Sequence, residues 1–291
     1  MTGPRDGLAR SVRVRLAQRA RAIGVDPNLV LTRYVVERYL YRLSCSPYVD
    51  QFVLKGGLLL LAWLGETLRP TRDADLLGFG NLSGDAIAGI FRDICLVLVV
   101  PDAATFLPDS VRVAPIRQDD IYGGQRATLQ ARVGAARLTV QVDIGVGDAV
   151  TPEPQWLDYP SMLDELPRPR LRAYPRETVV AEKLHAMVVL GLRNSRMKDY
   201  FDVYALQREA EMDTAQLARA IATTFARRQT ALPEGIPMAL SNQFANDQTK
   251  QAQWQAFLAR SHVKAPELQV VVLEVRARLA ATLDQARKVS E

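Results

Sequence analysis

The chain has 291 residues, of which 48% are hydrophobic and 24% charged, so it has room for one large or two ordinary folded domains and does not fit a disordered class. Its longest apolar runs are far shorter than the ~20 residues that cross a bilayer, and no signal-type apolar core begins the sequence; we therefore expect a cytoplasmic protein with no membrane partner. Two cysteines and two histidines are too few for a disulfide framework or a zinc cluster.

The net charge of +5 and the pI near 9.3 permit an anionic macromolecular partner. Arginine outnumbers lysine by 31 to 6, so the chain uses arginine wherever it needs only positive charge. Three of the six lysines, Lys55, Lys183 and Lys198, lie in candidate motifs. A compact ammonium is not interchangeable with a guanidinium fork at a phosphate, which explains why these three positions are lysine in an arginine-rich chain.

Two helices are expected at the start of the chain. Residues 5–23 alternate arginines with a thin apolar stripe at helical spacing, and two interpretations stay open: an RNA contact, or a solvated basic helix packed through its stripe. Asp26 followed by Pro27 is typical of an N-cap and a first-turn proline, so a second helix is expected from there to about Tyr41.

The most informative stretch runs from Phe52 to Leu76. A short apolar strand meets Gly56-Gly57, and the continuous apolar run after it predicts a buried helix whose first backbone N–H groups can face an anion. Beyond Pro70, period-two alternation places Asp73 and Asp75 on one face of a strand. Such a pair can be a solvated edge, but carboxylates one helix after a glycine turn also suit Mg²⁺ with a substrate triphosphate.

Further along, Ser83–Ile94 predicts a helix and Leu96–Val100 a strand. Residues 125–133, a turn at Gly134 and the alternating segment 137–144 predict a hairpin whose polar face ends at Asp143. Six of the sixteen prolines then fall within residues 151–175, which predicts a crossover, and everything after it has the pattern of helices.

A second cluster of charge is expected in these helices. Lys183 falls on the apolar side of the helix over 177–190. Either its aliphatic chain extends past the apolar residues so that the ammonium reaches water, or the ammonium is partly enclosed and contacts a triphosphate. In the next helix Asp199 and Asp202 lie one turn apart, beside Lys198. The sequence alone does not decide which of the two aspartates matters more.

Taken together, these residues resemble a known family. Gly56-Gly57, a helix and then Asp73-x-Asp75 resemble the signature of the DNA polymerase β-like nucleotidyltransferases, although that superfamily more often has Gly-Ser at the turn. Lys55, the run from Arg69 through Thr71 to Asp75, and the segments around Lys183 and Asp199 are similar to the AbiEii/MenT nucleotidyltransferase toxins.

The resemblance implies a fold and a set of site residues. The fold would be α+β and bilobed, with a mixed-sheet nucleotidyltransferase-like lobe at 50–150, N-terminal helices at 1–49, the crossover at 151–176 and a helical lobe at 177–291. The nucleotide would be bound by Lys55, Gly56, Gly57, Arg69, Thr71 and Lys183; Asp73, Asp75 and Asp143 would hold Mg²⁺ or Mn²⁺; and the catalytic set would be Asp73, Asp75, Lys183 and Asp199, with Lys198 and Asp202 as secondary candidates.

The resemblance also implies an activity. Such a toxin of an AbiE-like type IV toxin–antitoxin system would transfer nucleotides from an NTP to the 3′ end of tRNA, block aminoacylation and translation, and pair with a cognate antitoxin. Two alternatives stay open: nucleotidylation of another RNA, a protein or a small molecule by the same site, or a catalytically silent RNA-binding scaffold.

Overall fold

Helices begin the chain and a mixed sheet follows them. The computed structural model describes residues 4–65, 71–116 and 123–290. Helix α1 (Pro4–Ile23) is followed by α2 (Pro27–Ser44), whose N-cap Asp26 accepts a hydrogen bond from the Asn28 amide, as the Asp-Pro pair predicted. Strand β1 (Phe52–Lys55) leads directly into α3 (Gly56–Leu64), so the expected strand, glycine turn and helix are confirmed.

In the described residues, seven strands form one sheet in the order β3-β4-β5-β2-β1-β7-β6. Strand β1 pairs antiparallel with β2 and parallel with β7, and β2 pairs parallel with β5, so the sheet is mixed. The remaining bounds in this part of the chain are β2 (Ala74–Gly78), α4 (Gly84–Leu96), β3 (Ala104–Pro115), β4 (Gly124–Val133), β5 (Ala136–Val146), β6 (Gln155–Asp158) and β7 (Arg170–Ala173).

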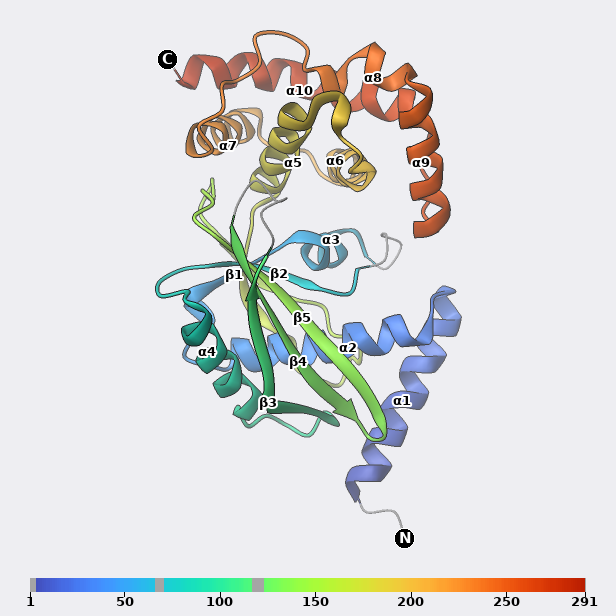
Figure 1. Cartoon of the computed structure of the whole chain (residues 1–291). Coiled ribbons are helices and arrows are strands. Elements are labelled where there is room, and N and C mark those ends of the chain that lie inside the picture. The colour runs from blue at the N-terminus through green and yellow to red at the C-terminus, as the bar shows by residue number, and fades with distance from the viewer. Residues whose placement is uncertain (1–3, 66–70, 117–122, 291) are drawn as a thin grey trace. The chain divides into compact units, whose positions relative to one another are not determined.

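The hairpin β4–β5 formed as its pattern predicted. Gly134 has φ +60° at the first position of the two-residue turn, the backbone that a type II′ hairpin needs. Because that turn is fixed, the whole register is fixed, and Arg126 faces Asp143 across the two strands. Helices α2 and α4 pack against the apolar face of the sheet (Figure 1), where Val140, Val142 and Ile144 are fully buried.

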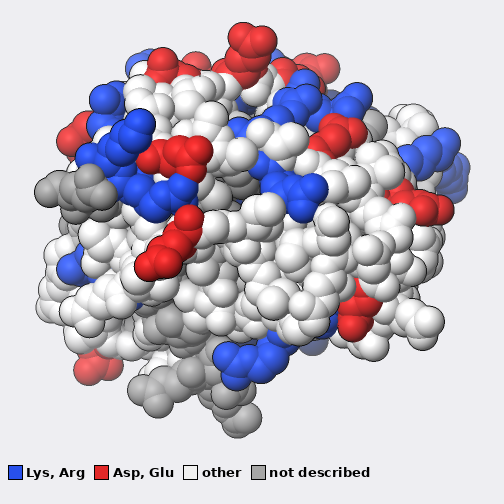
Figure 2. Space-filling view, turned by 90° about the horizontal axis from the view of Figure 1, so that it is seen from above, with Lys and Arg blue, Asp and Glu red and all other residues white. Residues whose placement is uncertain are grey.

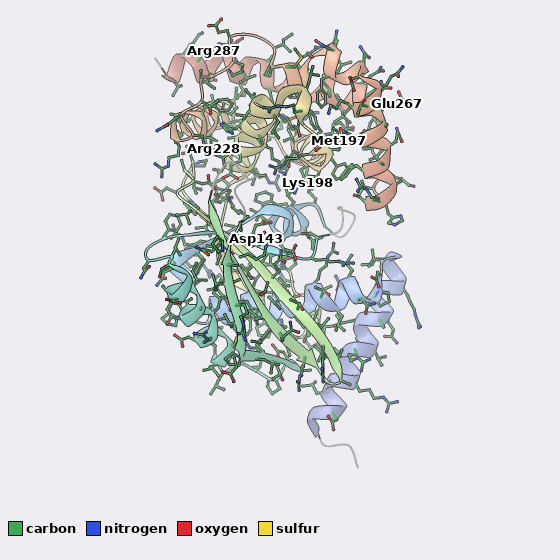
Figure 3. All side chains as sticks on the ribbon, viewed as in Figure 1. Asp143, Met197, Lys198, Arg228, Glu267 and Arg287 are labelled. Carbon is green, nitrogen blue, oxygen red and sulfur yellow. The ribbon has the colours of Figure 1, made fainter. Side chains whose placement is uncertain are left out.

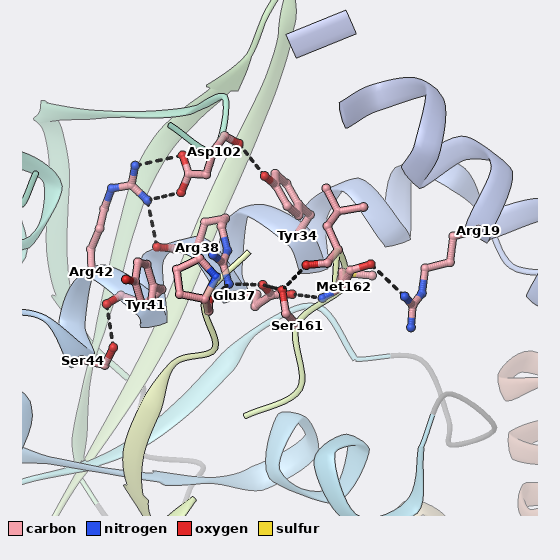
Figure 4. A network of polar contacts seen from close by, with 12 residues as sticks. Arg19, Tyr34, Glu37, Arg38, Tyr41, Arg42, Ser44, Asp102, Ser161 and Met162 are labelled. Atoms are coloured by element: carbon pink, nitrogen blue, oxygen red, sulfur yellow. Dashed lines mark hydrogen bonds and ion pairs between the residues drawn. The ribbon is translucent and has the colours of Figure 1, made fainter. Parts of the chain in front are cut away.

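Charged side chains are also buried on that helical side. Arg42 of α2 makes a bidentate ion pair with Asp102, at 2.8 and 3.1 Å. Glu37 accepts hydrogen bonds from Arg38, from the Ser161 hydroxyl at 3.1 Å and from the Met162 amide at 2.7 Å (Figure 4). Helix α2 therefore carries a network of buried ions as well as its apolar packing.

One predicted strand is absent from the residues that the structure describes, and two strands are present that were not predicted. Residues 97–100 form no strand: α4 continues to Leu96, and Leu98 is 96% exposed, because no neighbouring strand pairs with this apolar run. The expected proline crossover contains β6 and β7, which complete one edge of the sheet beside β1.

The chain divides into two compact units. The first comprises residues 1–62, 70–147 and 155–173 and holds the whole sheet; the second comprises 63–69, 148–154 and 174–291. As expected, the C-terminal region is helical, with α5 (Arg176–Leu190), α6 (Met197–Glu209), α7 (Thr214–Arg227), α8 (Asn242–Asn246), α9 (Gln248–Ser261) and α10 (Leu268–Ser290). Among the described residues, no helix is both long and apolar enough to cross a bilayer.

Candidate active site

The glycine turn at Gly56 lies in direct contact with the side chain of Asp75. Gly56 has φ +70°, and a Cβ placed on it would stand 1.9 Å from Asp75 Oδ2 and 2.6 Å from Asp75 Cβ. Only glycine adopts this backbone at no cost and also leaves that space empty. The glycine that we expected to admit a phosphate therefore first admits the carboxylate of Asp75.

Four charged side chains form a row across four neighbouring strands. Lys55 of β1 is in register with Asp75 of β2, Asp75 with Asp143 of β5, and Asp143 with Arg126 of β4. Directly opposed residues share a face of the sheet and strands are about 4.8 Å apart, so the row places two carboxylates side by side between two cations. We call this set the charged row.

Arg126 is the member of the charged row that the sequence analysis missed. Its Nε and Nη2 donate to the two carboxylate oxygens of Asp143, each at 2.7 Å. The signal that could have found it was present: a two-residue turn at Gly134-Ala135 fixes which residue of β4 faces Asp143.

Asp73 lies at a bend just before β2, two residues from Asp75, so the strand that we expected to carry both carboxylates holds only Asp75. Burial raises the pKa of the Asp73 carboxyl, and the negative charges of Asp143 and Asp75 raise it further. A divalent cation relieves the repulsion between carboxylates that lie close together, and carboxylate oxygens are the ligands that Mg²⁺ prefers. The chemistry of the donors therefore fits a hard cation.

The geometry of the carboxylates is looser than the sequence suggested. In the described part of the chain, no group of three or more His, Cys, Asp and Glu side chains is arranged to hold a metal ion. Asp143 is engaged by Arg126 in this conformation, which leaves Asp73 and Asp75 as the better candidates for ligands.

Two other candidates lie around this edge. The backbone carbonyl of Thr71 accepts a hydrogen bond from Arg33 Nε at 3.0 Å, so α2 fixes the segment that enters β2. Arg69 falls outside the described residues. Gly57 is buried in the first turn of α3.

The second unit contains the other group of candidates, and there Lys183 is held by two aspartates. Its Nζ donates to Asp199 Oδ1 at 2.7 Å and to Asp202 Oδ2 at 2.8 Å. Both aspartates are 0% exposed, whereas 14% of the lysine side chain reaches solvent. The ammonium of Lys183 therefore turns toward buried carboxylates rather than simply extending past the apolar rim.

The two aspartates differ in one respect. Arg196 Nε lies 2.9 Å from Asp199 Oδ2, which gives Asp199 a second cation. Burial alone would raise the pKa of Asp199, but the charges of Lys183 and then Arg196 outweigh it and hold that pKa below its ordinary value. Lys198, labelled in Figure 3, is exposed on the same first turn of α6.

A neighbouring polar network was not foreseen. Arg228 Nη2 contacts Asp148 at 2.9 Å and Glu182 at 3.3 Å, and its Nη1 lies 3.3 Å from His185 Nδ1. His185 is 1% exposed, and its Nε2 lies 2.9 Å from the Thr230 hydroxyl. Burial, followed by the charge of Arg228, lowers the pKa of His185 to about 4.

The mixed sheet with its flanking helices has the fold of solved structures described as nucleotidyltransferases. A crystal structure of a proposed nucleotidyltransferase from H. pylori superposes with a TM-score of 0.50 at 14% identity, covering 92% of this chain and 100% of that one. JHP933 from Helicobacter pylori has a TM-score of 0.48 at 14% identity, with 88% and 92% covered. No curated protein sequence matches.

The sequence identifies the group more closely than these structures do. Residues 38–285 match the family described as nucleotidyl transferase AbiEii toxin, type IV TA system. The match extends over most of the chain, including the charged row and the Lys183 cluster. This chain belongs to the AbiEii family of nucleotidyltransferase toxins.

Proposed function

We propose that this nucleotidyltransferase uses Mg²⁺ to transfer nucleotides from an NTP to the 3′ end of tRNA, so that the tRNA is no longer aminoacylated and translation stops. The observation that carries the proposal is the charged row, with Asp75 pressed against Gly56 at the turn into α3. This places carboxylates next to the backbone N–H groups that begin a helix of nine residues.

The residues of the first unit take the following roles in the proposal. Asp73 and Asp75 would hold the metal, which when bound supplies positive charge against the triphosphate. The backbone of Gly56 and Gly57 would face the phosphates, and Lys55 would add a compact positive charge beside them. Asp143 would set the orientation of Arg126, whose guanidinium can pair equally well with a phosphate.

In the second unit, Lys183 would neutralise charge that develops on the phosphates during transfer. The low pKa of Asp199 favours one of two roles for this residue. A carboxylate that ionises easily is a weak base at neutral pH, so Asp199 would position the lysine rather than take the proton of the attacking hydroxyl. Asp202 would share that task, because it contacts the same ammonium.

The partners follow from the family. Membership of a toxin–antitoxin family supports an antitoxin as the protein partner. The net charge of +5 is consistent with an RNA acceptor.

The test is a transfer assay with purified chain, bulk tRNA, Mg²⁺ and each labelled nucleoside triphosphate in turn. We expect label on tRNA, a longer 3′ end and a preference for one nucleotide. The Asp75→Asn variant, which keeps the volume of the side chain, should transfer none. Full transfer by Asp75→Asn would disprove the site. Label on protein would favour the first alternative acceptor, and bound nucleotide without any label would favour a silent scaffold.

A further inference from the structure

The polar face of the β4–β5 hairpin continues well beyond the charged row. Past the Arg126–Asp143 pair, the same face carries Thr128 and Gln130 on β4 and Thr139 and Gln141 on β5, and it ends at Arg132 and Arg137 beside the turn. Helices α2 and α4 pack on the opposite face, and in Figure 1 this face of β4 and β5 is turned toward the viewer. We call it the hairpin face.

Arg132 and Arg137 oppose each other directly. They are a register pair of neighbouring antiparallel strands, both are exposed, and within the described residues neither guanidinium makes a hydrogen bond or an ion pair. Like charges in such a pair repel and destabilise the sheet. Folding alone therefore gives no reason for two arginines at these positions.

Protection of a sheet edge does not explain the pair either. Charged residues often stop edge strands from pairing with other chains. However, β4 and β5 are interior strands, paired on both sides by β3 and β2 respectively, so their backbone groups are already satisfied. A ligand that brings negative charge to the pair accounts for it better.

The chemistry of the hairpin face narrows that ligand. Asp143 is its only carboxylate among the register pairs of β4 and β5, and Arg126 already neutralises it. The remaining side chains are hydroxyls, amides and guanidinium groups, which are the groups that contact phosphate and sugar oxygens in nucleic-acid complexes. By contrast, the face of the second unit seen in Figure 2 mixes both signs of charge.

We infer that the hairpin face binds the sugar–phosphate backbone of the RNA acceptor, with Arg132 and Arg137 as a two-pronged phosphate contact at its far end. Six residues of strand, about 20 Å, separate Arg137 from Asp143. The contact would therefore engage RNA several nucleotides away from the end placed at the charged row. This inference rests on the proposed RNA acceptor but names a surface that the transfer chemistry does not require.

The experiment measures binding of bulk tRNA to the full chain across a range of KCl concentrations, without nucleotide. The variant is Arg132→Gln with Arg137→Gln. Its control is Arg92→Gln with Arg168→Gln, which removes the same charge from exposed positions on α4 and next to Pro167, whose carbonyl accepts from Arg38 of α2.

Two lost phosphate contacts should lower the slope of log K against log salt by about 1.4–1.8, which corresponds to roughly tenfold to thirtyfold weaker binding near 0.15 M salt. The control should keep the wild-type slope. The melting temperature of Arg132→Gln with Arg137→Gln should be unchanged or higher, because a repulsion has been removed.

Unchanged tRNA binding by the hairpin variant, an equal loss in the control, or no tRNA binding by the wild type would each overturn the inference. Its failure is distinguishable from failure of the proposed function. If the wild type binds tRNA through this pair but adds no nucleotide, the surface stands and the transfer reaction falls. If transfer occurs and both variants bind alike, the reaction stands and the surface falls.

Discussion

Replacing Gly56 by alanine should remove nucleotide transfer by displacing Asp75. The new Cβ would lie 1.9 Å from Asp75 Oδ2, whereas ordinary contact begins at 3.4 Å, so the carboxylate must move by about 1.5 Å. Rotation of the side chain cannot relieve this clash, because Asp75 Cβ itself would be only 2.6 Å away. The backbone of β2 must therefore shift. A displacement of about 1 Å at a reacting group can cost ~100-fold in rate, and we expect at least that loss.

Gly24 supplies a matched control. Its φ is +69°, against +70° at Gly56, but nothing lies within 4 Å of a Cβ added there. Gly24→Ala therefore carries only the left-handed backbone penalty, roughly 1–2 kcal/mol of unfolding free energy. Labelled-nucleotide transfer per folded molecule, with urea unfolding of both variants, separates the two effects. Wild-type transfer by Gly56→Ala, or an equal loss in Gly24→Ala, would refute the reasoning.

Three more predictions concern buried and crowded charges. Lys183→Met should lower the free energy of unfolding by ~3–5 kcal/mol, because it leaves the carboxylates of Asp199 and Asp202 buried without their shared cation. Urea unfolding measures this loss, and a loss below ~1 kcal/mol would contradict the ion cluster. Adding Asp199→Asn and Asp202→Asn to the variant should recover part of the stability but no transfer. His185, with a pKa lowered to about 4, stays neutral in the folded chain while its unfolded form takes up a proton below pH ~6.5, so stability is full above that pH and falls by up to ~1.4 kcal/mol per unit toward pH 4; His185→Gln should show a shallower fall, and an identical pH profile would rule this out. Asp73→Asn relieves repulsion from neighbouring carboxylates, so its melting temperature should equal or exceed that of wild type while transfer is lost, and a lower melting temperature with normal transfer would count against its role.

Local patterns predicted much of the fold. The Asp26-Pro27 cap, the Gly56 turn and the Gly134 hairpin depend on neighbouring residues, so they were visible in the sequence and formed as expected. Strands β6 and β7 were missed because each has four residues and lies among prolines. Their existence depends on β1, more than a hundred residues earlier in the chain, and no local signal reports that pairing.

The sites show the same division. Alternation placed Asp75 and Asp143 on their strands, although Asp73 lies just outside β2, and helical spacing placed Lys183 beside the core. The identity of single residues does not show which side chains pair with each other, because Arg126 faces Asp143 only through the register of the hairpin. Their roles in transfer remain predictions for the variants above.

The ion network around α2 also bears on when the N-terminal helices can pack during synthesis. Glu37 is synthesised early, but its hydrogen-bond donors Ser161 and Met162 follow 124 and 125 residues later. At about 5–20 residues per second, a ribosome needs roughly 6–25 s to supply them. Until then α2 cannot bury Glu37 without leaving a carboxylate short of partners, which is costly in an apolar core. We therefore expect the N-terminal helices of this chain to pack firmly only after residues 161 and 162 have been synthesised.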